Sequence, residues 1–190
     1  MKLKNIALIA LAATAVIIIV IALSMGTVIF DLFSYTATGS ENLKPDGSIA
    51  GKALVVYDPG ISGMTKNAAY SIARGLESRA YDVTVAGIRS PEASKASGYD
   101  MVIVGSPTYA GNPTGPVTDY LNSVQPSKEA AIGVFATGMS PEGENPTDSE
   151  RVMAGILANR SINAKAKMKL ISADNMEHKC GDFASRMTAS

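Results

Sequence analysis

The most prominent pattern along the chain is an uncharged apolar run near its amino end. Residues 6–30, IALIALAATAVIIIVIALSMGTVIF, contain no charged side chain over 25 positions. A helix rises about 1.5 Å per residue, so this run is long enough to cross a bilayer with some tilt. The apolar part of a cleaved signal peptide is usually only about 7–15 residues long, and no small-x-small cleavage site follows. We therefore interpret residues 1–33 as a transmembrane signal anchor.

The charges that flank this run predict its orientation. Lys2 and Lys4 precede the run, whereas the carboxylates Asp31, Glu41 and Asp46 follow it. Basic flanks tend to stay on the cytoplasmic side of a membrane. The sequence therefore predicts a single-pass protein of the cell membrane, with a cytoplasmic amino terminus and its domain outside.

Beyond residue 33 the chain is first polar, and segments with a strand pattern then alternate with segments that have a helical pattern. Residues 34–51, SYTATGSENLKPDGSIAG, are small and polar with Gly and Pro, which is typical of a flexible linker. From residue 52 onward, apolar runs of strand length alternate with helical patterns. We expect strands at 52–58, 81–88, 100–106, 130–138 and 165–173, helices at 65–80, 113–124 and 147–161, and a short helix or loop at 92–98.

The inner strands are apolar throughout rather than alternating, as VVY, MVIVG and IGVFA show. Strands covered by helices on both faces have this composition. Residues 52–190 are therefore predicted to form one α/β domain with a doubly wound parallel sheet. In such a sheet the ligand lies beyond the carboxyl ends of the strands. After the last strand, MEHKCGDFASRMTAS leaves room for only a short final helix.

Composition and charge narrow the possible partners. The chain has 17 Lys and Arg against 17 Asp and Glu, and removing Lys2 and Lys4 leaves 15 against 17, a net charge of −2, for residues 31–190. A nucleic-acid-binding domain would need a basic face, so no nucleic-acid partner is predicted. The single cysteine, Cys180, excludes an internal disulfide. His178 and Asp182 lie near it, but a lone His and a lone Cys near a terminus seldom bind metal, and we predict no metal site.

The loop after the first strand, DPGISGMT at 58–65, has the composition of a phosphate-binding loop. Gly60 and Gly63 allow the backbone to approach a ligand, and Ser62 and Thr65 supply hydroxyls. Free amides and the helix dipole at the start of the following helix favour an anion. The loop fits neither a Walker motif nor a dinucleotide motif. Capping of the helix by Ser62 or Thr65 is the alternative interpretation.

Two further loops follow later strands, so all three belong to the same edge of the sheet. GSPTYAGNPTGP at 105–116 carries Tyr109, which could stack on a planar ring or merely cover the end of the sheet. TGMSPEGENPT at 137–147 is long and acidic, with Glu142 and Glu144. Long ordered loops are often functional, although a plain surface connection explains this one equally well.

The chain from about residue 52 to residue 175 resembles flavodoxins and flavodoxin-like flavoproteins. SGMT at 62–65 is close to the T-G-N-T phosphate loop of that family, and GSPTYAGNPTGPV at 105–117 is similar to its G-S-P-x-Y-x-G loop before a proline-started helix. The resemblance implies a five-stranded sheet of order 2-1-3-4-5 with FMN over strands one, three and four. It implies a phosphate loop at Gly60, Ser62, Gly63, Met64 and Thr65, ring contacts from Ser106, Pro107, Thr108, Tyr109, Gly111 and Asn112, and closure by Gly138.

Three residues of the first loop depart from the family pattern. Pro59 has no amide hydrogen, Gly60 stands where Ser or Thr is common, and Met64 replaces the usual Asn. Each departure would weaken the hold on a phosphate by about 0.5–1.5 kcal/mol if it removes one neutral hydrogen bond.

We therefore predict a membrane-anchored flavodoxin-like protein that binds FMN and transfers electrons to or from an unidentified redox partner. The chemistry would belong to the flavin, so no catalytic side chain is required. Glu142 and Glu144, if near the ring, would disfavour an anionic reduced flavin. One alternative is a flavodoxin-like quinone reductase or related oxidoreductase, with a substrate pocket formed by the 137–147 loop. The other is a binding module that has kept the fold without the cofactor.

Overall fold

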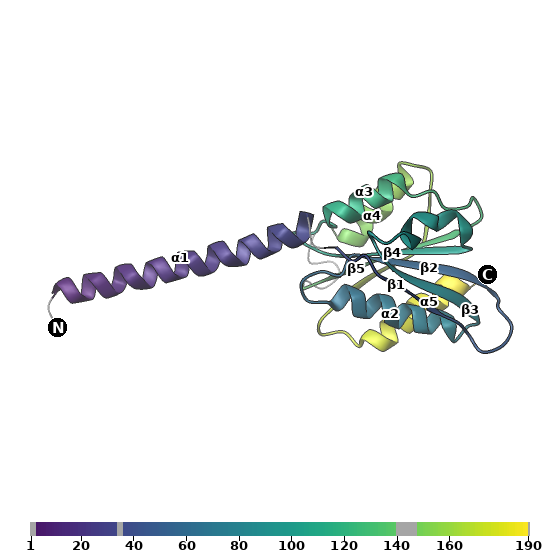
Figure 1. The fold of residues 1–190 in the computed structure, drawn as a ribbon, viewed down its shortest axis with the longest axis horizontal. Helices are drawn as coiled ribbons and strands as arrows, with labels where there is room; N and C mark the ends of the chain where they lie inside the picture. Colours follow the sequence, from purple (N-terminus) through teal and green to yellow (C-terminus); the bar gives the residue numbers. More distant parts are fainter. Residues whose placement is uncertain (1–2, 34–35, 140–147, 190) are drawn as a thin grey trace.

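The computed structural model describes residues 3–33, 36–139 and 148–189. A long helix, α1 (Leu3–Phe33), projects from an α/β domain (Figure 1). The described part of the domain contains one six-stranded sheet of order β1-β3-β2-β4-β5-β6. Its strands are β1 (Ser40–Leu43), β2 (Gly51–Tyr57), β3 (Tyr81–Gly87), β4 (Met101–Pro107), β5 (Ala131–Gly138) and β6 (Ala164–Ile171).

The five strands from β2 to β6 are parallel, and their spatial order is the predicted 2-1-3-4-5. Each of them corresponds to one of the strands expected from the sequence. Because helices cover both faces of this sheet, its inner strands can be apolar at every position. Residues 101–107 of β4 are buried without exception. The predicted fold class is confirmed.

The sixth strand corrects the expected strand count and lies within the segment interpreted as a linker. Strand β1 pairs antiparallel with β3, with Ser40 opposite Ala86 and Leu43 opposite Val83. The sequence gives little sign of this strand, since three of its four residues are exposed at the sheet edge. A side-chain hydrogen bond reinforces the pairing, because Asn42 Nδ2 donates to Asp82 Oδ1 of β3 at 2.9 Å.

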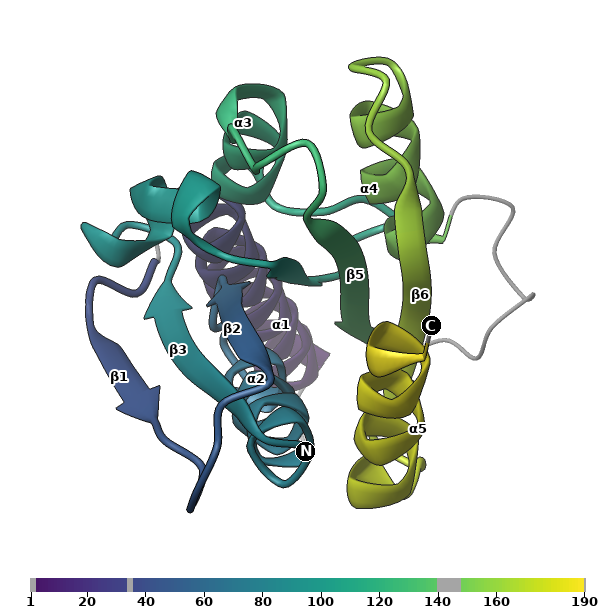
Figure 2. The same cartoon turned by 90° about the vertical axis from the view of Figure 1, so that its right-hand side faces the viewer.

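Helices pack on both faces of the sheet (Figures 1 and 2). One face carries α2 (Met64–Glu77) and α5 (Met176–Thr188), and the other carries α3 (Gly115–Ser123), α4 (Ser149–Ala158) and the 3₁₀ helix η1 (Glu92–Gly98). Two hydrophobic clusters, one on each face, form the core.

The final helix α5 is longer than predicted, with 13 residues. Cys180, Phe183, Ala184 and Met187 are all buried, and their spacing places them on one face of the helix. Asn175 caps the helix, because its side chain accepts a hydrogen bond from the His178 amide at 3.1 Å. Burial of the apolar stripe against α2 and the sheet therefore stabilises a helix whose overall composition is polar.

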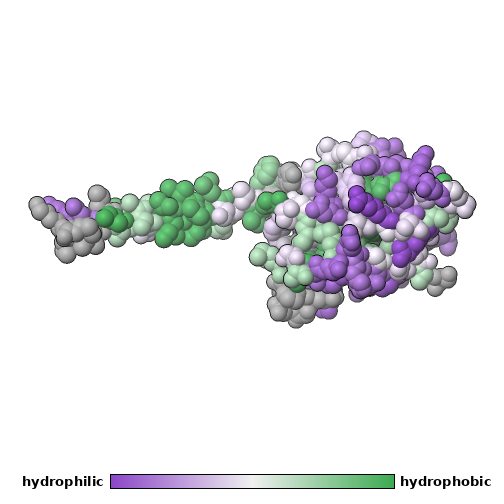
Figure 3. All heavy atoms as spheres, turned by 90° about the horizontal axis from the view of Figure 1, so that it is seen from below, coloured by the Kyte–Doolittle hydropathy of each residue, from purple (hydrophilic) through white to green (hydrophobic). Residues whose placement is uncertain are grey.

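Helix α1 contains the apolar run seen in the sequence. Its segment Ile9–Phe30 has a mean hydropathy of 2.6, none of it is buried, and its length suffices to cross a membrane. Figure 3 shows this apolar surface projecting from the domain, whose face in that view carries many hydrophilic residues.

The single cysteine gives a first testable prediction. Cys180 is fully buried, and burial raises the pKa of its thiol to about 11. Because only the thiolate is nucleophilic, we expect iodoacetamide at pH 8 to alkylate the folded chain at least ~100-fold more slowly than the urea-unfolded chain. Mass spectrometry of the time course measures both rates at this one site. Equal rates would mean that the thiol is not held inside the domain.

Candidate functional site

The loops that follow β2, β4 and β5 meet at the carboxyl edge of the sheet. The amide of Asp58, the first residue after β2, donates to Gly105 O at 3.1 Å. The amide of Thr108, the first residue after β4, donates to Thr137 O at 2.7 Å. The third loop is described only as far as Met139, and Glu142 and Glu144 lie outside the described residues.

The first loop depends on glycine at two positions. Gly60 and Gly63 have φ angles of +66° and +70°, a region that other residues rarely adopt. A Cβ atom at Gly60 would lie 2.9 Å from the Cβ of Pro107 in the second loop. The departure from the family pattern at Gly60 therefore has a steric reason, because no side chain fits between the two loops.

Thr65 joins the start of α2 to the end of β5. Its side chain is fully buried, and its Oγ1 lies 2.7 Å from Thr137 Oγ1. Because a hydroxyl pair uses only one of its two hydrogens, the other hydrogen remains available to an acceptor. The amides of Thr65 and Lys66, in the first turn of α2, donate to no acceptor in the described parts of the chain.

Ser62 and Met64 lie where the first loop runs into α2. The exposed Ser62 side chain accepts a hydrogen bond from the Met64 amide at 3.3 Å. The Met64 side chain is half-buried and packs against the core cluster below α2. Of these two side chains, only the Ser62 hydroxyl therefore lies on the surface of the loop.

The second loop is held by its own side chains. Ser106 is buried, and its Oγ donates to Pro107 O at 2.9 Å and accepts from the Thr114 amide at 3.1 Å. The amides of Tyr109 and Asn112 each donate to the other residue's carbonyl, at 3.1 and 3.0 Å. These bonds fix a tight turn that leaves the Tyr109 side chain half-buried.

Positive φ angles at Ala110 (49°) and Gly111 (79°) complete this turn. The Asn112 side-chain amide donates to Ala110 O at 3.1 Å. The side chains of Ser106 and Asn112 thus stabilise the loop, and Thr108 and Tyr109 lie between them in the chain.

An unsatisfied hydroxyl marks the junction of the second and third loops. Thr108 Oγ1 is buried and has no hydrogen-bond partner among residues 3–33, 36–139 and 148–189. A buried polar atom left in this state costs about 1–3 kcal/mol. A Cβ atom at the neighbouring Gly138 would lie 3.2 Å from Thr108 Cβ and 3.5 Å from Lys169 Nζ. The junction therefore combines a free hydroxyl with an ammonium group, and a polar or anionic ligand would satisfy both.

Four residues of the site were not predicted from the sequence, namely Asp58, Thr114, Thr137 and Lys169. Asp58 and Thr114 are fully buried and are joined by a 2.5 Å hydrogen bond from Thr114 Oγ1 to Asp58 Oδ2, which ties the first loop to the second. Asp58 and Thr137 could have been noticed as polar residues at the ends of apolar strands. Lys169 is only 4 % exposed on β6, and no local pattern distinguishes it from its exposed neighbours.

The donors present at this edge fit a phosphorylated ligand with a flat ring. The open amides at the start of α2 suit a phosphate, and the loop of Thr108 and Tyr109 offers a hydroxyl and an aromatic face.

The three possible metal ligands near the carboxyl end do not converge on one point. His178 Nδ1 and Asp182 Oδ2 lie 3.4 Å apart on the exposed side of α5, whereas Cys180 points into the core. Within the described ranges, three or more His, Cys, Asp or Glu side chains are nowhere grouped so that they could hold an ion.

Comparison with known proteins identifies the fold. No protein-family model and no curated protein matches the sequence. Among solved structures, flavodoxin 1 from Bacillus cereus matches with a TM-score of 0.56 and 21% identity, over 73% of this chain and 99% of that chain. The Streptococcus pneumoniae TIGR4 flavodoxin gives a TM-score of 0.57 and 19% identity, over 72% of this chain and 97% of that chain.

An enzyme has the same architecture. The apo form of the NADH:FMN oxidoreductase EMOB matches with a TM-score of 0.55 and 15% identity, over 74% of this chain and 91% of that chain. At these identities the likeness establishes the architecture alone. The domain is flavodoxin-like.

Proposed function

We propose that this protein binds FMN at the carboxyl edge of its sheet and acts in electron transfer. The main support for the proposal is the Thr65–Thr137 hydroxyl pair, whose oxygens lie 2.7 Å apart. This pair lies beside the amides at the start of α2 that donate to no acceptor in the described residues. The pair lies at the carboxyl edge of the parallel sheet, where doubly wound folds bind their ligands. The unsatisfied Thr108 hydroxyl supports the same location.

Each part of the edge has a separate role in this proposal. The α2 amides, the Ser62 hydroxyl and the Thr65–Thr137 pair hold the phosphate. Thr108 and Tyr109 contact the ring, and Gly138 leaves room for it beside Lys169. The bound flavin supplies the redox chemistry. The protein positions it, and the Lys169 ammonium adjusts its reduction potential through charge.

The membrane location is part of the proposal. Helix α1 anchors the protein by a single span, and Lys2 and Lys4 hold the amino terminus in the cytoplasm. The domain and its flavin then lie at the outer surface of the membrane, where the redox partner meets them.

Titration of FMN tests the proposal directly. When the detergent-solubilised full chain is added to FMN, we expect the flavin fluorescence to be quenched with one FMN bound per chain. Thr65→Val keeps the shape of the side chain but removes its hydroxyl, so we expect about tenfold weaker binding. Thr188→Val is the matched control, because among the described residues the Thr188 hydroxyl bonds only to carbonyls of α5. Its affinity should stay within about twofold of the parent.

Two results would contradict the proposal. One is a parent chain that leaves the FMN fluorescence unchanged at micromolar protein. The other is a Thr65→Val variant that binds FMN as tightly as Thr188→Val, which would remove the hydroxyl pair from the site.

A further inference from the structure

The chain enters the sheet at the same edge that carries the candidate site. The amide of Arg89 donates to Ala37 O at 2.9 Å, and the amide of Gly87 donates to Gly39 O at 2.8 Å. A Cβ atom at Gly87 would lie 2.5 Å from the Ala37 carbonyl, so the two backbones are in close contact. Residues 37–39 are therefore fixed beside the carboxyl end of β3.

This attachment leaves very little slack between α1 and the domain. Helix α1 ends at Phe33, and Ala37 is only four residues further along the chain. Four Cα–Cα steps of 3.8 Å span at most about 15 Å. If α1 crosses a membrane, the carboxyl edge of the sheet is held within about that distance of the point where the helix emerges. A flexible linker over 34–51 would have imposed no such limit. Because β1 and residues 37–39 are held against β3, the chain does not have that freedom.

Exposed apolar side chains are concentrated at the same edge. Outside α1, the large hydrophobic residues exposed in the described domain are Ile49, Ile61 and Met139. Ile61 follows β2, and Met139 follows β5 and is 92% exposed. Ile49 instead precedes β2 and lies at the opposite edge of the sheet.

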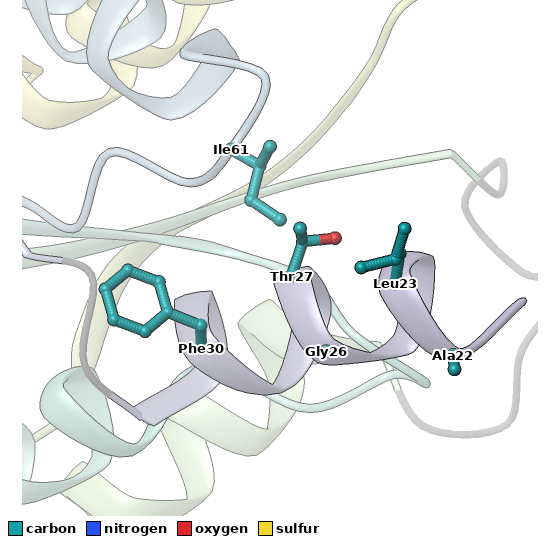
Figure 4. A pocket seen from close by; sticks show the side chains of 6 residues that line it. All are labelled: Ala22, Leu23, Gly26, Thr27, Phe30 and Ile61. Carbon is teal, nitrogen blue, oxygen red and sulfur yellow. The ribbon is translucent and has the colours of Figure 1, made fainter. Parts of the chain in front are cut away.

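Ile61 also faces the last turns of the apolar helix. Figure 4 shows its side chain directed across an open pocket toward Thr27 and Leu23 of α1. The pocket has a volume of about 530 Å³, and Ala22, Gly26 and Phe30 complete its lining. Since Leu23 and Thr27 belong to the Ile9–Phe30 segment, Ile61 lies level with the end of the possible span.

We propose that the carboxyl edge of the sheet docks on the surface of the bilayer that anchors α1, with Ile61 and Met139 in contact with lipid. The occupant of the pocket between Ile61 and α1 is then lipid acyl chain. Docking itself does not require FMN. Its consequence for the partner rests on the proposed function: the flavin site opens at the membrane surface, and a redox partner must reach that surface to exchange electrons.

Tryptophan fluorescence tests the docking, because the chain contains no Trp of its own. The full chain is reconstituted into phosphatidylcholine vesicles whose acyl chains carry bromine, a contact quencher. Three single variants are compared, namely Ile61→Trp, Ile49→Trp as the control at the opposite edge, and Leu23→Trp as the reporter of helix insertion. We expect Ile61→Trp to be quenched at least half as strongly as Leu23→Trp, and Ile49→Trp to be quenched by less than about a tenth.

Each other outcome overturns the proposal for a different reason. If Leu23→Trp is quenched but Ile61→Trp behaves like Ile49→Trp, the helix is inserted and the edge does not dock. If Leu23→Trp is not quenched, α1 does not enter the bilayer, and the docking surface has no membrane to face. All three measurements are made without FMN, so a failure of FMN binding leaves the quenching pattern unchanged and the two proposals are tested separately.

Discussion

Gly105→Ala is expected to destabilise the domain by about 3 kcal/mol or more, an effect at the upper end of those seen for overpacked cores. Gly105 lies in β4 directly opposite Phe135 of β5. A Cβ atom at this position would lie 2.0 Å from Phe135 Cζ. Both residues are fully buried between layers, so the ring has no space to move into. Urea unfolding of the detergent-solubilised full chain, followed by tyrosine fluorescence, measures the loss.

Two further variants show whether the ring is the cause. Gly155→Ala adds the same methyl group in α4 where no atom lies within 4 Å, so it should leave stability unchanged or raise it by up to ~1 kcal/mol. Phe135→Leu shortens the opposing side chain. The double variant Gly105→Ala/Phe135→Leu should lose less stability than the two single losses added together. Simple additivity would show that the two positions do not clash.

Gly60→Ala is expected to weaken FMN binding at least ~30-fold. The positive φ at Gly60 adds about 1–2 kcal/mol of backbone strain to any other residue. In addition, the new Cβ atom would press against Pro107 and force the first two loops apart. Because the proposed site needs both loops at once, a small separation affects phosphate and ring contacts together. The measurement is the same quenching titration, with the unfolding free energy determined in parallel.

Gly47→Ala is the matched control for this variant. Gly47 also has a positive φ, +101°, but it lies in the turn before β2 with no atom within 4 Å of its Cβ position. Its substitution should reduce stability without changing FMN affinity more than about twofold. The proposed arrangement of the loops is wrong if Gly60→Ala binds FMN with the affinity of Gly47→Ala.

The position of β1 determines which fragments of the chain keep the complete sheet. A fragment that begins at residue 45 would lack the edge strand Ser40–Leu43 and the contacts of Ala37 and Gly39. It would leave the outer edge of β3 unpaired, and unpaired strand edges favour association between chains. A fragment that begins at Thr36 keeps these pairs.

The patterns of the sequence predicted the parallel sheet and the edge of the candidate site, whereas the strand order was implied by the resemblance of two loops to flavodoxins. Runs such as MVIVG at 101–105 are apolar throughout because both faces of the strand are covered, and this signal is local. The glycine-rich loop at 58–65 and the start of α2 are likewise adjacent in the chain, so a phosphate site there could be proposed from composition. The apolar segment Ile9–Phe30 was evident for the same reason.

The tertiary structure alone decided which side chains meet across the sheet. Thr65 and Thr137 are 72 positions apart, and Asp58 and Thr114 are 56 apart, so no window of sequence contains either pair. The strand β1 was not predicted because it has no apolar pattern of its own. It forms because its backbone pairs with that of β3. That pairing fixes residues 37–39 beside the candidate site, and only a folded sheet can supply it. Local patterns report burial and backbone preference, whereas contacts between distant segments depend on how the layers pack.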